Sequence, residues 1–263
     1  MELELGGRTA LVIGGSRGIG KAIATELAAE GARVAISGRT RSDLETAASQ
    51  ITATGTHPVV SFECDTRDAH SVDRMVSSVL EQFGHIDILV NCAAQPGGLL
   101  HQLQPGGHRA LADDLDTKVI GYLRCIEAVV ASMQERGWGR IVNLGGLAAR
   151  SSSSVSGMRN LALVHLGKTL SDQLGAYGIT VNTVHPGATR TEQTETQDTE
   201  RIRNEEITRE EIDRKRRDSN AIGRMVDARE IGWLVAFLCS PKAAAITGES
   251  IAAGGGVGHA VFP

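Results

Sequence analysis

TALVIGGSRGIG, residues 9–20, decides the expected fold, because a short apolar run leads directly into a glycine-rich turn and then into a helical pattern. The run Thr9–Ile13 is typical of a buried strand. Glycines in the following turn, Gly14–Gly20, allow the backbone to approach a ligand closely. Unpaired N–H groups at the start of the next helix favour a phosphate. The stretch therefore predicts a pyrophosphate-binding turn. The alternative is a tight strand-to-helix turn without a ligand, which the position after the first strand disfavours.

Short β-branched runs alternate with helical patterns along the rest of the chain. The predicted strands are Thr9–Ile13, Arg33–Ser37, Val59–Glu63, Ile86–Asn91, Arg140–Leu144, Ile179–Val184 and Ser250–Ala253. One helix is predicted over Ala69–Phe83, where apolar residues recur at three- and four-residue steps and stop at Gly84. We therefore predict the α/β class, with a single Rossmann-like domain over residues 1–263. Its doubly wound parallel sheet would have about seven strands, with about six helices on its two faces.

The composition excludes several classes of function. The chain has 263 residues, with 27 basic against 31 acidic side chains and only 3% aromatic residues. It lacks both the basic field that holds a nucleic-acid backbone and the aromatic surface that stacks on bases. The four cysteines form no Cys-x-x-Cys pair and the eight histidines no His-x-x-x-His pair, so neither disulfides nor a metal site are expected. The most apolar later stretch, Ile231–Cys239, is too short to span a bilayer, and the start of the chain has no apolar leader. We expect a cytoplasmic protein that acts on a small molecule.

One segment, Glu192–Asp218, breaks the alternation with ten acidic and seven basic residues. Acidic residues stand four positions before basic ones in the pairs Glu205–Arg209, Glu210–Arg214, Glu211–Lys215 and Asp213–Arg217. Such pairs support a solvent-exposed helix. The basic run Arg214–Arg217 could instead indicate a nucleic-acid patch, but the interleaved acids favour a solvated face. We predict a charged lid or insertion at about residues 190–220, near the ligand crevice.

The order of the motifs resembles that of the short-chain dehydrogenase/reductase family over nearly the whole chain. The turn has the family spacing Gly-x-x-x-Gly-x-Gly, and Asn91–Ala94 looks like the family's Asn-Asn-Ala-Gly segment. The resemblance implies hydride transfer between a nicotinamide dinucleotide and a carbonyl/alcohol pair. It also implies a set of cofactor-binding residues: Gly14, Ser16, Arg17, Gly18, Ile19, Gly20, Arg39, Asp65, Thr66, Asn91, Ala93, Pro186, Gly187, Thr189 and Thr191.

The end of the second predicted strand indicates which dinucleotide is preferred. A carboxylate at this position would bind the ribose 2′-OH of NAD, but the sequence there is Ile36-Ser37-Gly38-Arg39. Arg39 and Arg17 can instead bind a 2′-phosphate through charge-assisted hydrogen bonds. We therefore predict NADP(H) as the cofactor. In the alternative, both arginines only line the rim of a loop.

The family's proton-transferring motif, Tyr-x-x-x-Lys, is absent from the sequence. The chain has two tyrosines, Tyr122 and Tyr177, and the residues four positions after them are Ile126 and Val181. Alignment back from the helical stretch Leu163–Leu170 implies that Ser156 takes the tyrosine position and Asn160 the lysine position. The resemblance also implies that Gly146 takes the catalytic serine position and Lys118 the helical asparagine position. In the alternative, a local gap brings one of the serines of Ser151–Ser154 to the catalytic serine position.

Replacement candidates are Lys118, Ser156, Arg159 and Asn160. Lys118 could donate a proton if burial lowers its pKa, and Arg159 could stabilise an oxyanion without giving up its proton. Ser156, Arg159 and Asn160 share one helix face. The alternatives are a solvated helix residue for Lys118 and a surface or interface salt bridge for Arg159.

Three functions remain open at this point. The first is an atypical NADP(H)-dependent oxidoreductase, the second a non-redox enzyme catalysing elimination or isomerisation, and the third a non-catalytic dinucleotide-binding protein. The resemblance further implies a homotetramer or homodimer, because Asp114–Ala131 and Val155–Tyr177 look like the helices that family members pack into dimers.

Overall fold

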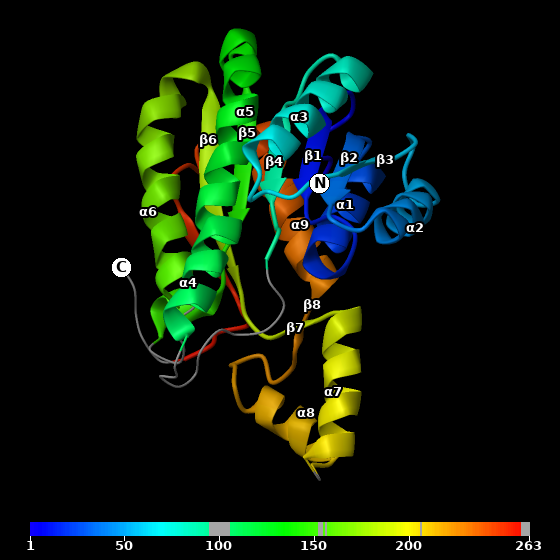
Figure 1. Ribbon diagram of the computed structural model, residues 1–263, viewed down its shortest axis with the longest axis vertical. Helices are drawn as coiled ribbons and strands as arrows, with labels where there is room; N and C mark the ends of the chain where they lie inside the picture. Colours follow the sequence, from blue (N-terminus) through cyan, green and yellow to red (C-terminus); the bar gives the residue numbers. More distant parts are fainter. Residues whose placement is uncertain (95–105, 152–154, 156, 206, 259–263) are drawn as a thin grey trace.

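A parallel sheet of seven strands lies at the centre of the computed structural model, which describes residues 1–94, 106–151, 155, 157–205 and 207–258 (Figure 1). The strand order is β3-β2-β1-β4-β5-β6-β9. The strands are β1 (Thr9–Ile13), β2 (Arg33–Gly38), β3 (Val60–Glu63), β4 (Ile88–Asn91), β5 (Gly139–Leu144), β6 (Ile179–Pro186) and β9 (Ser250–Ala253). The predicted α/β class and doubly wound parallel sheet are confirmed. The crossover between β3 and β4 makes the order reverse beside β1, which is where such sheets bind ligands.

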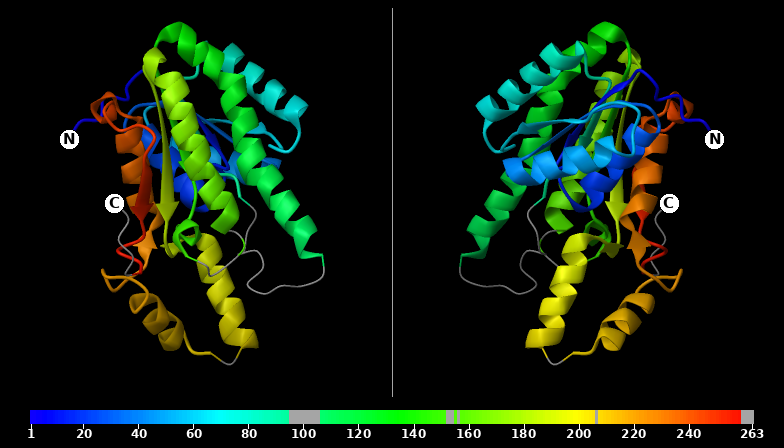
Figure 2. Two further views of the ribbon diagram at one scale, coloured as in Figure 1. Left: turned by 90° about the vertical axis from the view of Figure 1, so that its left-hand side faces the viewer. Right: turned by 90° about the vertical axis from the view of Figure 1, so that its right-hand side faces the viewer.

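Helices cover both faces of this sheet (Figures 1 and 2). The helices of the described residues are α1 (Gly18–Ala29), α2 (Arg41–Thr52), α3 (Ala69–Phe83), α4 (Gly107–Leu115), α5 (Gly121–Arg136), α6 (Gly157–Leu174), α7 (Glu192–Asn204), α8 (Arg209–Arg217) and α9 (Ala228–Cys239). Of these, α7 and α8 lie away from the faces of the sheet. The predicted end of α3 is confirmed, since Gly84 closes it with a φ of 80°. More helices occur than expected, because the stretch between β4 and β5 divides into α4 and α5 and the charged segment forms α7 and α8.

Two apolar layers hold the helices to the sheet. Alternate residues of β1 enter different layers, as the two-residue period of a strand requires. Ala10 and Val12 pack in the layer that contains residues of α1, α2 and α9. Leu11 and Ile13 pack in the layer that contains residues of α3 and α5. Every residue of β1 is buried, so the glycine turn that follows it stands on a rigid support.

A π-helical turn, Asp116–Ile120, joins α4 to α5. π-turns insert an extra residue into a helix and are frequent at functional sites. Gly121, directly after this turn, lies so close to Thr66 that a Cβ would come within 2.8 Å of its hydroxyl oxygen. The turn thus packs tightly against the loop that follows β3, and Lys118 within the turn is buried.

The charged segment forms two helices beyond the carboxyl ends of the strands, joined to the domain by the short pair β7 (Thr189–Arg190) and β8 (Val226–Asp227) (Figures 1 and 2). A charge-assisted pair between Arg216 and the buried Asp198 links α8 to α7, with Nη2 2.6 Å from Oδ1. The predicted pairing of Glu205 with Arg209 is wrong, because α7 ends at Asn204 and Arg209 begins α8. Glu205 instead accepts from Arg201 (3.1 Å).

Within the described residues, no helix combines the length and the apolar character needed to cross a membrane.

Candidate cofactor and active site

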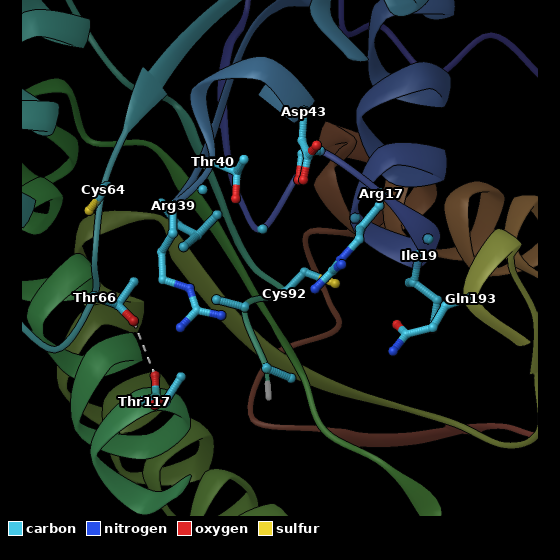
Figure 3. A pocket seen from close by; sticks show the side chains of 18 of the residues that line it. Arg17, Ile19, Arg39, Thr40, Asp43, Cys64, Thr66, Cys92, Thr117 and Gln193 are labelled. Atoms are coloured by element: carbon cyan, nitrogen blue, oxygen red, sulfur yellow. Dashed lines mark hydrogen bonds between the residues drawn. The ribbon is translucent and has the colours of Figure 1, made fainter. Parts of the chain in front are cut away.

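A cavity of about 420 Å³ opens at the carboxyl ends of β1, β2 and β4 (Figure 3). Its walls come from the glycine turn, from Arg39 after β2, from Cys92 and Ala93 after β4, and from Thr191 after β7. The predicted cofactor residues that line it are Gly14, Ser16, Arg17, Gly18, Ile19, Gly20, Arg39, Asp65, Thr66, Ala93, Gly187, Thr189 and Thr191. Segments far apart in sequence therefore meet around one crevice.

The glycine turn has no room for larger side chains. Gly14 has a φ of 79°, and a Cβ there would lie 2.8 Å from the backbone nitrogen of Ala93. A Cβ on Gly20 would lie 2.1 Å from the carbonyl oxygen of Gly14. The turn can therefore bring its N–H groups to the cavity only with glycine at these two positions.

Two arginines enter the cavity from different walls, Arg39 from the end of β2 and Arg17 from the start of α1 (Figure 3). A third, Arg67, binds the Asp65 carboxylate, with Nη2 2.8 Å from Oδ2. Hydrogen bonds from Arg67 hold the pKa of Asp65 below its usual range, and the charge of Arg39 lowers it further. Asp65 is thus ionised and paired, so its charge is largely balanced by Arg67.

Two predicted cofactor residues do not line the cavity. Asn91 is fully buried, and its Nδ2 donates to Oδ1 of Asn143 (2.9 Å), which ties β4 to β5. Pro186 ends β6 opposite Ala253. Both lie just before residues of the wall, so their positions fix the backbone that follows. The sequence prediction overlooked Thr40, Asp43, Thr117 and Gln193, which do line the cavity. Thr117 also accepts at its carbonyl from the Thr66 hydroxyl (3.3 Å; Figure 3).

Lys118 lies in the interior behind this cavity. Its side chain is 4% exposed, and Nζ donates to the carbonyl oxygen of Gly145 (2.9 Å). Burial, followed by the charge of Arg159, lowers the pKa of Lys118 to about 7. The alternative of a solvated helix residue is therefore wrong: the π-turn and the close packing of Gly121 turn this lysine inward. Cys92, which lines the cavity, lies near the Lys118 amine.

Arg159 on α6 forms a buried ion pair with Asp114 on α4. Asp114 is fully buried and Arg159 is 8% exposed, so this is no surface salt bridge. The pair leaves Asp114 Oδ2 and Arg159 Nε without hydrogen-bond partners in the part of the chain that the structure describes. Buried polar atoms without partners are costly, and such atoms are available to a ligand or to water. Sequence reasoning did not single out Asp114, although it precedes Lys118 by one helical turn.

Asn160 occupies the space that Gly146 leaves free. A Cβ on Gly146 would lie 3.0 Å from Nδ2 of Asn160. Asn160 is buried, and its Oδ1 has no partner among the described residues. The structure thus brings Lys118, Arg159 and Asn160 to one region near Gly145 and Gly146. Ser156, the fourth candidate, lies outside the described residues, as does most of Gln95–Arg109.

Neither tyrosine is available there as a proton donor. Tyr122 is fully buried, and its hydroxyl donates to the carbonyl oxygen of Ala93 (2.9 Å). Burial raises the pKa of Tyr122 well above its ordinary value. Tyr177 belongs to the short helix after α6, at the end that leads into the start of β6. The carboxyl ends of the strands, where the cavity opens, are at the other edge of the sheet.

A doubly wound parallel sheet with a glycine turn at its switch point is the architecture of Rossmann-type α/β proteins. The family model described as enoyl-(acyl carrier protein) reductase matches residues 13–258. The chain belongs to the short-chain dehydrogenase/reductase family.

Three known proteins illustrate the likeness. The short-chain reductase protein NovJ of Streptomyces niveus is 33% identical over 94% of this chain and 92% of its own length. The 3-oxoacyl-[acyl-carrier-protein] reductase FabG of Vibrio cholerae is 31% identical over 97% of this chain and 99% of its own. The crystal structure of L-sorbose reductase from Gluconobacter frateurii, complexed with NADPH and L-sorbose, has a TM-score of 0.89 at 26% identity and covers 98% of each chain.

Proposed function

We propose that this protein is an NADP(H)-dependent oxidoreductase that acts on a carbonyl/alcohol pair, with Lys118 in place of the family's proton-transferring tyrosine. The observation that carries the proposal is the buried Lys118 amine, which hydrogen-bonds to Gly145 and whose pKa burial lowers to about 7. A general acid works best when its pKa is close to the working pH.

The cavity suits an NADP(H) dinucleotide. The glycine turn and the start of α1 present N–H groups for the pyrophosphate. Arg17 and Arg39 reach the cavity, and the sequence from Ile36 to Arg39 carries no acidic side chain to repel a 2′-phosphate. The complex of L-sorbose reductase with NADPH is in line with this choice. When bound, the reduced nicotinamide supplies a hydride for the carbonyl carbon.

The remaining chemistry belongs to the chain. Lys118 in its ammonium form transfers a proton from Nζ to the carbonyl oxygen as charge develops there, and the neutral amine regains one from solvent. Arg159 stays protonated and stabilises the developing negative charge through space. Asp114 holds the Arg159 guanidinium in place. The helices α7 and α8 would act as a lid over the substrate side of the same crevice.

The proposal is tested first by binding. Calorimetric titration with NADPH should show one saturable site per chain with micromolar affinity or better. A melting screen of carbonyl compounds, with and without NADPH, should then find compounds that stabilise the protein only in its presence. Absence of NADPH binding would overturn the cofactor assignment.

Restoring the family's two residues should not by itself give a fast reductase. In the double variant Ser156→Tyr, Asn160→Lys, Gly146 and Lys118 remain at the serine and asparagine positions, and the new lysine competes for space beside Gly146. We expect carbonyl reduction to gain less than about tenfold, since a correctly placed acid is worth 10² to 10⁴ in rate. A gain of a thousandfold or more in steady-state assays would refute an altered site built around Lys118.

We also propose a homodimer or homotetramer. Met158 and Leu161 on α6 are each 58% exposed, and Ile120 beside α5 is 45% exposed. These apolar side chains lie on the two helices expected to pair between subunits, and their burial would favour association. Sedimentation should give a dimer or larger species at micromolar concentration, and Leu161→Asp should shift it towards monomer. A monomeric wild-type protein would contradict the proposal.

A further inference from the structure

The N-terminus of α1 receives its cap from a distant part of the chain. Arg17 is the N-cap residue, and its side chain makes no capping hydrogen bond. The first helical N–H, that of Gly18, instead donates to Oε2 of Glu192 (3.2 Å). The other oxygen of the same carboxylate lies 3.5 Å from Nζ of Lys21 on α1. A carboxylate from the first residue of α7 thus binds the positive end of α1.

This carboxylate stands beside the wall of the cavity. Gly18 lines the cavity, and so do Thr191 and Gln193 on either side of Glu192. The Thr191 Cγ2 is 3.5 Å from the position of a Cβ on Gly18. The start of α7 therefore closes directly onto the glycine turn, with an acidic group at the place where helix N–H groups attract phosphate.

Glu192 is ionised in this position at neutral pH. Partial burial raises the pKa of the Glu192 carboxyl. Hydrogen bonds from backbone N–H groups and the charge of Lys21 lower this pKa by more than burial raises it, so the net shift is downward. The helix α7 does not depend on the contact with α1, because Thr191 and Thr194 already form a capping box at its start. The contact can break without unfolding either helix.

We infer that Glu192 competes with the dinucleotide pyrophosphate for the N-terminus of α1. Both are anions that need the same N–H group, so binding of the dinucleotide displaces the carboxylate and frees the start of α7. Cofactor affinity and the position of the α7–α8 segment are then coupled, and thermodynamic linkage makes the coupling reciprocal. The inference rests on the proposed function in one respect, that the ligand at the glycine turn is a dinucleotide.

The test compares Glu192→Gln with Glu195→Gln. Glu195 lies in the same first turn of α7 and pairs with Arg209 on α8, not with α1 (2.9 Å). Both variants change the net charge equally, which matches their long-range electrostatic effects. Calorimetry should give an NADPH Kd about tenfold lower for Glu192→Gln than for wild type, and an unchanged Kd for Glu195→Gln.

An unchanged or weaker NADPH affinity in Glu192→Gln, or an equal gain in Glu195→Gln, would overturn the inference. If no variant binds NADPH, the proposed function fails, and inorganic pyrophosphate becomes the probe. Glu192→Gln should then bind pyrophosphate about tenfold more tightly than the other two proteins. Equal affinities for pyrophosphate, or no binding to any of them, would exclude the competition independently of the cofactor.

Discussion

Replacing Lys118 with methionine is expected to lower the rate of carbonyl reduction by about 10² to 10⁴ while making the protein more stable. The loss of rate follows because methionine has no proton to transfer. Arg159 cannot take over, since a guanidinium does not deprotonate at working pH. Single-turnover kinetics with saturating NADPH measure this step directly.

The gain in stability has a separate cause. Burial lowers the Lys118 pKa from 10.5 in the unfolded chain to about 7 in the folded protein. Between these two pH values the unfolded chain binds the proton and the folded protein does not, so the free energy of unfolding rises with pH across this window. Below about pH 7 the buried ammonium lowers the free energy of unfolding by its full amount, on the order of 3 to 5 kcal/mol. Methionine removes it, so Lys118→Met should unfold at a higher denaturant concentration at pH 7, with little difference above pH 10.5.

Lys168→Met is the matched control. Lys168 on α6 is 62% exposed and pairs with Asp172 at the surface, so neither rate nor stability should change by much. A Lys118→Met variant with unchanged turnover would remove Lys118 from the mechanism. A variant that lost both rate and stability would show that the lysine is structural.

The double variant Arg17→Ala, Arg39→Ala should lose at least about 10² in NADPH affinity and little in NADH affinity. Each arginine offers a 2′-phosphate a charge-assisted contact worth about 1.5 to 3 kcal/mol, and NADH lacks that phosphate. Calorimetry with both dinucleotides measures the preference.

Arg41→Ala serves as the control for this variant. Arg41 is two residues from Arg39 but points to Glu63 (3.1 Å), and it is not part of the cavity wall. Its removal changes the charge of the same region without removing a predicted contact. Wild-type protein that binds NADH as tightly as NADPH, or a double variant that keeps its NADPH affinity, would contradict the assignment.

The sheet and the glycine turn could be predicted from sequence because their signals are local. The β1 run and the turn after it stand side by side in the chain, and the amphipathic pattern of α3 ends at its own glycine. The glycines of the turn and Arg39 after β2 follow from the same short-range patterns. The remaining cavity residues that were predicted came from the resemblance to the short-chain dehydrogenase/reductase family.

The rest of the site depends on contacts between distant segments. Asp114 pairs with Arg159, which lies 45 residues away, and Glu192 accepts from Gly18, which lies 174 residues away. Lys118 is buried in a π-turn, which the hydrophobic periodicity of the sequence does not predict. The break between α7 and α8 likewise replaces the predicted pairing of Glu205 with Arg209, because Thr208 starts a new helix with its own capping box. Glu205 pairs with Arg201 instead.

Stopped-flow measurement of nicotinamide absorbance tests whether this chain transfers a proton from Lys118 during an NADPH-dependent reduction. The substrates to use are the carbonyl compounds that raise the melting temperature of the NADPH complex. We expect the absorbance to fall in a single turnover, with a rate constant that decreases as the pH rises through about 7, where Lys118 loses its proton. NADPH that stays reduced with every such compound would contradict this mechanism.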